Sequence, residues 1–337
     1  MKVLIIGGTG LISQYITAGC VTKGYEVYLY NRKGSANYPN QVKTILGDRY
    51  NYASFEQQMQ SYHFDCVIDM IAFKPADVES AARAFKGRTK QYIFCSTVDV
   101  YTKNSGALPI KETSPIGARK EFDYAFQKVA CEAVVNRCQK EGIFETTIIR
   151  PAHTHAPGNG IIHSLAVWST GNYIVDRFKK GLKIICHGDG TSVWVTAHAK
   201  DVSVAFVNAI GNKAAFGEAF HATGEEWMTW ITYYQNIAEA MGYPAPKLVF
   251  ILAHLLQKYE PEIGTICNEN FKYNNIFDNT KAKNILGYSY KTDFKTGIKE
   301  VIDWLESNGK VDKAETNPVY DKIISHWESI ENSIVAC

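Results

Sequence analysis

The chain begins with a short apolar run that leads directly into a glycine-rich turn and then into a helical pattern. The run VLIIG (3–7) is rich in β-branched residues, which is typical of a strand buried on both faces of a sheet. The segment GGTGLIS (7–13) follows, and residues 11–23 have helical spacing and end at Gly24. A strand, a glycine turn and a helix in this order predict the dinucleotide-binding start of an α/β fold.

The alternation of strands and helices continues through the first half of the chain. Further strands are expected at 25–31, 42–48, 64–72, 90–97 and 144–150, and helices at 54–62, 76–85 and from 128 toward 140. This alternation implies right-handed crossovers and a parallel, doubly wound Rossmann sheet. Past residue 151 the pattern loosens, so we expect a smaller lobe there. We therefore predict a dinucleotide-binding domain at 1–150, with contributions from 190–222, and a mainly substrate-binding lobe at 151–337.

Composition narrows the class of partner. The 337 residues are 46% hydrophobic and 21% charged, with a formal net charge of +2. This balance offers no electrostatic reason to bind nucleic acid or an anionic membrane. The first apolar run is shorter than the about 7–15 residues of a signal peptide, and no stretch approaches the about 20 needed to span a bilayer. We therefore expect a cytoplasmic protein that acts on a small molecule.

No metal site is expected. The eight cysteines are scattered singly and form no C-x-x-C pair, so the sequence signals neither a zinc site nor a redox motif. Three histidines, His153, His155 and His163, lie near one another in the sequence, but their spacing matches no familiar ligand pattern.

The glycine turn carries the main cofactor prediction. Gly7 permits the tight turn, and Gly10 lets the backbone approach a pyrophosphate that would lie at the positive end of the helix. Ser13 stands in the position of the third glycine, where a small residue serves helix packing. A glycine turn without a ligand is the simpler explanation, but its place between strand and helix favours binding. The cofactor-binding residues expected in this turn are Gly7, Thr9, Gly10, Leu11 and Ile12.

The end of the second strand bears on the choice of dinucleotide. It reads Asn31-Arg32-Lys33, where a site selective for NAD would place Asp or Glu on the ribose hydroxyls. A guanidinium can bind a 2′-phosphate through two hydrogen bonds and can stack on adenine. The sequence therefore predicts NAD(P) as the cofactor and favours NADP over NAD, with Asn31 and Arg32 as contacts. For Lys33, an exposed loop residue without a ligand is an equally good explanation.

A tyrosine and a lysine four residues apart, in YAFQK (124–128), are the candidate catalytic pair. They would lie on one helix face, where the ammonium of Lys128 would lower the pKa of the Tyr124 phenol from its ordinary value of about 10. The fifth strand ends in Ser96 and Thr97, whose hydroxyls could hold a substrate oxygen beside the phenol.

Seven segments together resemble one family. They are GGTGLIS, LGDR (46–49), STVDVY (96–101), YAFQK, RPAHTHAP (150–157), HAKDVSVAF (198–206) and FDNTKAKNILGY (277–288). The combination resembles the extended short-chain dehydrogenases/reductases of the NAD-dependent epimerase/dehydratase family. This resemblance implies a seven-stranded Rossmann sheet and, in many members, a homodimer.

The resemblance also implies roles for individual residues. Thr97 would hydrogen-bond the substrate oxygen, Tyr124 would act as acid or base, and Lys128 would contact the nicotinamide ribose and adjust the pKa of Tyr124. The further cofactor contacts implied are Asp48, Arg49, Ile71, Ala72, Tyr124, Pro151 and His153. The substrate contacts expected are Ser96, Thr97, His153 and Trp194.

Departures from the family pattern affect the expected substrate. His153 stands where many members have an asparagine that grips a sugar-nucleotide phosphate, and Trp194 stands where many have an arginine for the diphosphate. Both changes weaken the case for a nucleotide-diphosphate sugar. Dehydratases of the family place Asp-Glu after the strand-end Thr, whereas Val98-Asp99 supplies a single acid here, which disfavours dehydration.

Several functions stay open at this point. We expect an epimerase or oxidoreductase that acts on a hydroxyl or keto group of a sugar or nucleotide sugar through Thr97, Tyr124 and Lys128. The alternatives are an NADPH-dependent ketoreductase of a non-nucleotide substrate and a non-catalytic protein that binds NADP or RNA. RNA enters because the chain also resembles the chloroplast stem-loop-binding proteins in GGTGLIS, NRKG (31–34), GDR (47–49) and residues 198–212.

Overall fold

The computed structural model describes residues 1–34, 42–104, 106, 108–166 and 171–335. The chain forms two compact units. The first unit consists of Met1–Thr154, Ala197–Gly224 and Phe277–Lys291, and the second of His155–Thr196, Glu225–Ile276 and Thr292–Cys337.

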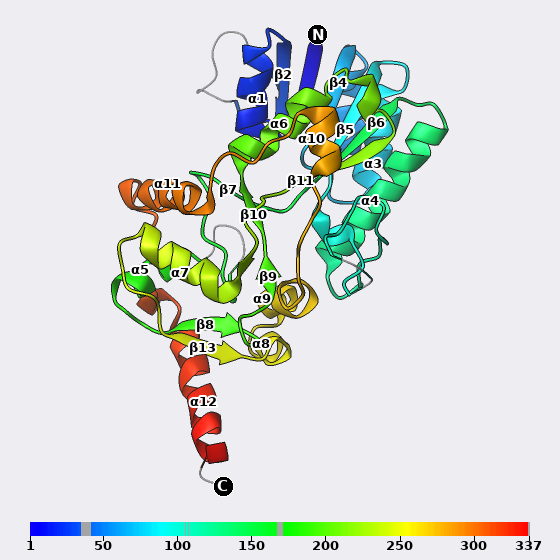
Figure 1. The fold of residues 1–337 in the computed structure, drawn as a ribbon. Helices are drawn as coiled ribbons and strands as arrows, with labels where there is room; N and C mark the ends of the chain where they lie inside the picture. Colours follow the sequence, from blue (N-terminus) through cyan, green and yellow to red (C-terminus); the bar gives the residue numbers. More distant parts are fainter. Residues whose placement is uncertain (35–41, 105, 107, 167–170, 336–337) are drawn as a thin grey trace. The chain divides into compact units, whose positions relative to one another are not determined.

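A seven-stranded parallel sheet forms the centre of the first unit, in the order β11-β6-β5-β4-β1-β2-β3 (Figure 1). Its strands are β1 (Lys2–Ile6), β2 (Glu26–Asn31), β3 (Val42–Leu46), β4 (Phe64–Asp69), β5 (Thr89–Cys95), β6 (Glu145–Pro151) and β11 (Glu218–Ala222). The doubly wound Rossmann sheet predicted from the sequence is confirmed.

Both faces of this sheet are covered by helices, which explains the continuous apolar runs of its strands. In β1, Val3 and Ile5 pack into one apolar cluster, and Leu4 and Ile6 into another on the opposite face. The first cluster includes residues of α1 (Ser13–Thr22), α6 (Ala199–Ala209) and α10 (Thr280–Leu286). The second includes residues of α2 (Tyr52–Met59), α3 (Pro75–Phe85) and α4 (Asp123–Lys140).

Some element boundaries differ from the prediction. The fifth strand was expected to continue through Ser96 and Thr97 but ends at Cys95, and the fourth ends at Asp69 rather than 72. The last predicted helix of the sheet region begins at Asp123 rather than near 128. The seventh strand, β11, reads EAFHA and contains no β-branched residue, so its sequence carries no strand signal.

A segment late in the chain, which the sequence predicts to be part of the second lobe, belongs to the first unit. Residues 277–291 belong to the first unit, and so do residues 197–224. The backbone N–H of Asp278 donates to the carbonyl of Ile110, at 2.9 Å, and the Nδ1 atom of His221 in β11 lies 2.9 Å from the carbonyl oxygen of Asp278. These long-range contacts, which no local pattern announces, hold the returning segment at the first unit.

The second unit is built around an aromatic cluster. Trp230, the first residue of α7, is fully buried, and its ring lies 5.0 Å from that of Trp194 and 4.7 Å from that of Phe271. The helices of this unit are α5 (Tyr173–Lys179), α7 (Trp230–Ala240), α8 (Ala253–Tyr259), α9 (Pro261–Ile266), α11 (Phe294–Ser307) and α12 (Pro318–Val335). Short strand pairs join β8 (Ile184–His187) to β13 (Leu248–Ile251) and β9 (Val193–Trp194) to β12 (Met228–Thr229). No helix among the described residues combines the length and apolarity needed to cross a membrane.

A buried ion pair involves Asp69, the last residue of β4. The Nη2 atom of Arg49 lies 3.2 Å from Oδ2 of Asp69, and both side chains are almost completely buried. Arg49 also donates to the carbonyl of Asp77, and the Tyr92 hydroxyl donates to Asp69 at 2.9 Å. The expectation that Arg49 lines an adenine pocket is therefore wrong, because its guanidinium is held inside the core.

Replacing Asp69 by Asn should destabilise the first unit strongly. The change leaves the Arg49 guanidinium buried without its carboxylate, which costs about 3–5 kcal/mol of unfolding free energy. Urea denaturation followed by circular dichroism measures this cost. The matched control is Glu56→Gln, whose partner Arg83 is 57% exposed and which should cost less than about 1 kcal/mol. Equal costs for the two variants would contradict the structural role of Asp69.

Candidate functional site

The glycine turn after β1 has positions that only glycine fits. Gly7 has a positive φ of 80°, and a Cβ there would lie 2.6 Å from Cγ2 of Ile71. Thr9 and Gly10 are exposed at the start of α1, and a Cβ on Gly10 would approach the Ser13 hydroxyl and the Gly7 carbonyl oxygen, at 3.3 and 3.7 Å. The predicted turn residues therefore form a tight turn that is exposed at Thr9 and Gly10, just before α1, and Ile71 lies against Gly7.

The end of β2 presents an unused hydrogen-bond donor. Asn31 is buried, with 7% of its surface exposed, and its Nδ2 atom has no hydrogen-bond partner among the described residues. Arg32 follows and is exposed, as is Asp48, whose carboxylate accepts a hydrogen bond from the backbone N–H of Tyr50 at 2.9 Å. An orphaned buried amide beside an exposed guanidinium fits the ribose end of a dinucleotide.

The candidate catalytic tyrosine lies in the first turn of α4. Because α4 begins at Asp123, Tyr124 and Lys128 are one turn apart on one helix face, as the sequence predicts. The Tyr124 phenol makes a hydrogen bond with the side chain of Thr97. Thr97 follows β5 and caps a short 3₁₀ helix, Val98–Val100, by accepting a hydrogen bond from the Asp99 N–H at 3.2 Å.

Lys128 is buried between two strand ends. Its Nζ atom donates to the carbonyl of Ala72, at 2.9 Å, and to that of Cys95, at 2.7 Å. The rings of Phe73 and Phe94 each lie 4.8 Å from the ammonium. Burial lowers the pKa of Lys128 from its ordinary value. Of the three donors of an ammonium, two are used by these carbonyls, so one is left for a ligand hydroxyl.

The pKa of Tyr124 is shifted in the direction opposite to the prediction. Burial of the phenol raises its pKa, and the nearby carboxylate of Asp99 raises it further, while the hydrogen bond with Thr97 acts the other way. The expected lowering by Lys128 is therefore wrong for the protein without a ligand. The ammonium is directed at two backbone carbonyls, and desolvation of the phenol dominates.

Ser96 and Trp194, two expected substrate contacts, have structural partners. The Ser96 hydroxyl donates to Oε1 of Glu132 at 2.5 Å, so it faces a buried network rather than the Tyr124 hydroxyl. Trp194 is 4% exposed and packs between Trp230 and Phe271 in the aromatic cluster of the second unit. Neither side chain is placed to make the substrate contact that is expected from the sequence.

The remaining predicted residues follow β6. Pro151 ends this strand, and His153 begins the short strand β7 (His153–His155). Burial lowers the pKa of His153 to about 4, so its imidazole is neutral at pH 7 and can donate or accept a hydrogen bond. No group of three or more His, Cys, Asp or Glu in the described part of the chain is arranged to hold a metal ion.

Glu132 and Arg150 are partners that are absent from the site expected from the sequence. Both are buried, and the Arg150 guanidinium binds both carboxylate oxygens of Glu132, at 2.9 and 2.7 Å. Glu132 lies four residues after Lys128 and eight after Tyr124, so helical spacing could have placed it on the same face.

Comparison with known proteins shows the family of this chain. The model of the family described as "NAD dependent epimerase/dehydratase family" matches residues 3–222. The chain belongs to this family. The glycine turn and, among the described residues, the unused donor of Asn31 and the third donor of the Lys128 ammonium are consistent with the dinucleotide that the family name implies.

Two curated relatives of this epimerase/dehydratase-family protein extend over most of its length. The Arabidopsis thaliana chloroplast stem-loop binding protein of 41 kDa b is 28% identical over 312 residues, which cover 88% of this chain and 77% of that protein. Human dTDP-D-glucose 4,6-dehydratase is 22% identical over 341 residues, which cover 91% of this chain and 90% of that protein.

Solved structures share the fold. A UDP-glucose 4-epimerase from Thermotoga maritima superposes with a TM-score of 0.73 at 19% identity, covering 91% of this chain and 99% of that chain. An epimerase from Methanothermobacter thermautotrophicus has a TM-score of 0.73 at 15% identity, covering 92% and 93% of the two chains. At these identities the likeness shows the extended Rossmann fold alone.

Acid should destabilise the protein in a defined window. Burial lowers the pKa of His153 and His187 to about 4 and that of His163 to about 3, from an ordinary 6.5. Between pH 6.5 and about 4 the unfolded chain binds protons that the folded chain does not, so stability falls as pH falls. Each histidine contributes up to about 1.4 kcal/mol per pH unit.

Urea denaturation midpoints, measured at intervals between pH 4 and 6.5, give the slope of stability against pH. His163→Gln should reduce it, whereas His63→Gln, a substitution at an exposed histidine, is the control and should leave it as in the wild type. A stability that is independent of pH between 4 and 6.5 would contradict the assignment of these buried histidines as neutral.

Proposed function

We propose that this protein is an NAD(P)-dependent enzyme that interconverts a hydroxyl and a keto group on a sugar or nucleotide sugar, with Thr97, Tyr124 and Lys128 as its catalytic residues. One observation carries the proposal. The Tyr124 phenol is hydrogen-bonded to Thr97 at the carboxyl edge of the sheet, and Lys128 is held one turn away on the same helix face.

Each part of the proposed site has a distinct binding role. The turn Gly7, Thr9, Gly10, Leu11 and Ile12 would hold the pyrophosphate, and Asn31, Arg32, Asp48, Ile71 and Ala72 the adenosine half. Lys128, with its unused donor, would hold the second ribose, and Pro151 and His153 would border the ring. The dinucleotide supplies the chemistry that the side chains lack, because its nicotinamide accepts and returns a hydride.

Tyr124 would move the proton. Because its pKa is raised, the phenol is protonated at pH 7 in the protein alone, which suits donation of a proton to a keto oxygen. As hydride adds to the carbonyl carbon, the phenol O–H bond breaks and the proton passes to the oxygen, which leaves an alcohol and a phenolate. Thr97 would hold that oxygen. In the reverse direction the phenolate would take the hydroxyl proton while the same carbon gives up a hydride to the oxidised dinucleotide, and return of that hydride to the other face of the ketone would give an epimer.

The substrate class is supported by relatives rather than by the site. Human dTDP-D-glucose 4,6-dehydratase and the Thermotoga maritima UDP-glucose 4-epimerase are named for nucleotide sugars. In this chain His153 stands where many members have asparagine, and Trp194 lies in the core. A sugar or another polyol without a diphosphate is therefore the alternative substrate. Dehydration is disfavoured because Asp99 is the single acid directly after Thr97 and Val98.

We extend the proposal to a preference for NADP. The end of β2 offers the buried amide of Asn31 and the exposed guanidinium of Arg32, and neither residue has the carboxylate that would repel a 2′-phosphate. The donor chemistry of these two side chains supports NADP, whereas the family name and the bound structures of relatives mention NAD.

RNA binding is the second candidate, because the chloroplast stem-loop binding protein is 28% identical over most of the chain. The net charge of +2 gives it no electrostatic support. Stem-loop RNA binding that weakens steeply with salt, in a protein without dinucleotide-dependent turnover, would favour this candidate over the enzyme.

Replacing Tyr124 by Phe should abolish turnover and leave cofactor affinity nearly unchanged. Loss of the proton donor should lower the rate of NADPH oxidation with a panel of keto sugars by about 10²–10⁴-fold. The affinity for NADPH, measured by its fluorescence, should stay within about twofold, since a single phenol oxygen is removed from the substrate side of the site. Tyr243→Phe, a change at a tyrosine of the second unit, is the control for the loss of a phenol. Undiminished turnover in the Tyr124→Phe variant would contradict the proposed mechanism.

Replacing Arg32 by Ala should change cofactor preference. A charge-assisted pair with a 2′-phosphate contributes about 1.5–3 kcal/mol, so the Kd for NADPH should rise about tenfold or more while that for NADH stays nearly constant. Lys33→Ala is the matched control, because Lys33 is the adjacent exposed cation and its loss should raise the Kd for NADPH less. Equal losses for NADPH and NADH would contradict a 2′-phosphate contact.

A further inference from the structure

Three side chains on one face of α4 are tied to the ends of the sheet at successive turns. Tyr124, Lys128 and Glu132 follow one another at intervals of four residues. Tyr124 meets Thr97, Lys128 meets the carbonyls that follow β4 and end β5, and Glu132 meets Ser96. The first two contacts belong to the proposed reaction, whereas the third lies one turn beyond it.

Glu132 joins the strand end that carries Thr97 to the neighbouring strand. Its Oε1 atom accepts hydrogen bonds from the Ser96 hydroxyl, at 2.5 Å, and from Nε of Arg150, at 2.9 Å. Its Oε2 atom accepts from Nη2 of Arg150 at 2.7 Å. All three side chains are at least 97% buried. A bidentate pair of this kind restricts both distance and orientation.

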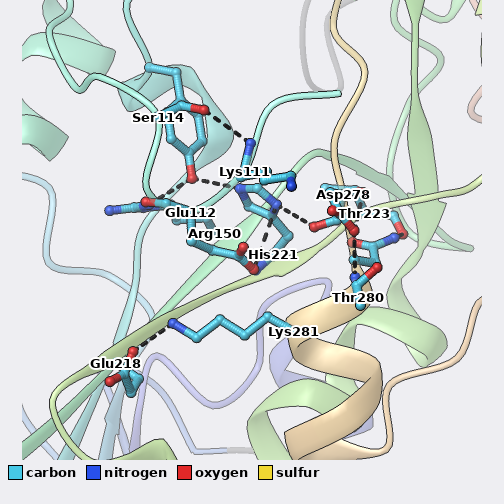
Figure 2. A network of polar contacts seen from close by, with 12 residues as sticks. Lys111, Glu112, Ser114, Arg150, Glu218, His221, Thr223, Asp278, Thr280 and Lys281 are labelled. Atoms are coloured by element: carbon cyan, nitrogen blue, oxygen red, sulfur yellow. Dashed lines mark hydrogen bonds and ion pairs between the residues drawn. The ribbon is translucent and has the colours of Figure 1, made fainter. Parts of the chain in front are cut away.

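Arg150 continues this network to β11 and to the returning segment. Its Nη1 atom donates to the Tyr101 hydroxyl at 2.7 Å, and that hydroxyl lies 2.6 Å from Nε2 of His221. Because Tyr101 accepts from Arg150, it donates to His221, whose Nδ1–H then donates to the Asp278 carbonyl at 2.9 Å. Figure 2 shows Arg150, His221 and Asp278 along this chain of contacts. Arg150 is therefore fixed from several elements and gives Glu132 a rigid anchor.

We propose that Glu132 is a positioning residue, which holds Ser96 against α4 and thereby sets the distance between the Thr97 hydroxyl and the Tyr124 phenol. Ser96 and Thr97 are adjacent, so a displacement of Ser96 passes directly to Thr97. Misplacement of a reacting group by about 1 Å can reduce a rate by about 100-fold. The catalytic consequence rests on the proposed function, whereas the Thr97–Tyr124 alignment is a property of the protein alone.

The test separates alignment from turnover. A fluorotyrosine placed at position 124 reports its hydrogen bond with Thr97 through its fluorine NMR signal in the cofactor-free protein. Ser96→Ala cuts the tie to Glu132 and leaves Arg150 paired, so the signal should move toward that of Thr97→Val. The matched control is Ser203→Ala in α6, which also removes a buried serine hydroxyl, one that donates to the Lys200 carbonyl at 2.7 Å, and should leave the signal in place.

A second variant keeps the test decisive. Glu132→Asp retains the charge beside Arg150 but shortens the side chain, so it cannot hold both partners and should also move the signal. Both variants should lower dinucleotide-dependent turnover by about tenfold or more, with NADPH affinity unchanged. A fluorine signal that matches the unsubstituted protein in both variants would overturn the positioning role. If no turnover is found in any protein, the proposed function fails, while the fluorine signals still decide the role of Glu132.

Discussion

The buried ammonium of Lys128 is the contact on which the arrangement of the site depends. It donates to the carbonyls of Ala72 and Cys95, which follow β4 and end β5, two neighbouring strands of the sheet. An ammonium removed from water is costly unless hydrogen bonds replace its hydration, so α4 cannot slide along the sheet without losing both contacts. The first turn of α4 is thereby held at the carboxyl edge, where Tyr124 meets Thr97.

Local patterns predict the parts of the site that depend on neighbours in sequence. The glycine turn between β1 and α1, the strand ends and the one-turn spacing of Tyr124 and Lys128 all follow from residue type and period. The directions of adjacent side chains at a strand end do not follow from residue type and period. Ser96 and Thr97 are adjacent, and the position of α4 decides that the first hydroxyl meets Glu132 and the second meets Tyr124.

Long-range contacts decide what local patterns cannot. Arg49 belongs to a motif that resembles an adenine contact, yet Asp69 draws its guanidinium into the core. Trp194 is expected from the sequence to contact a substrate, yet it packs against Trp230. Strand β11 and the segment 277–291 join the first unit through pairing with β6 and through contacts with Ile110 and His221. The raised pKa of Tyr124 likewise follows from burial, which depends on the whole fold.

The most direct test is a crystal structure of the protein with oxidised NADP. The proposed site predicts that the pyrophosphate contacts the backbone at Gly7–Ile12, that Lys128 donates to a hydroxyl of the nicotinamide ribose, and that the ring lies beside Tyr124. A dinucleotide bound with its nicotinamide away from Tyr124 and Lys128, or no binding at millimolar nucleotide, would contradict the assignment of this edge of the sheet as a redox site.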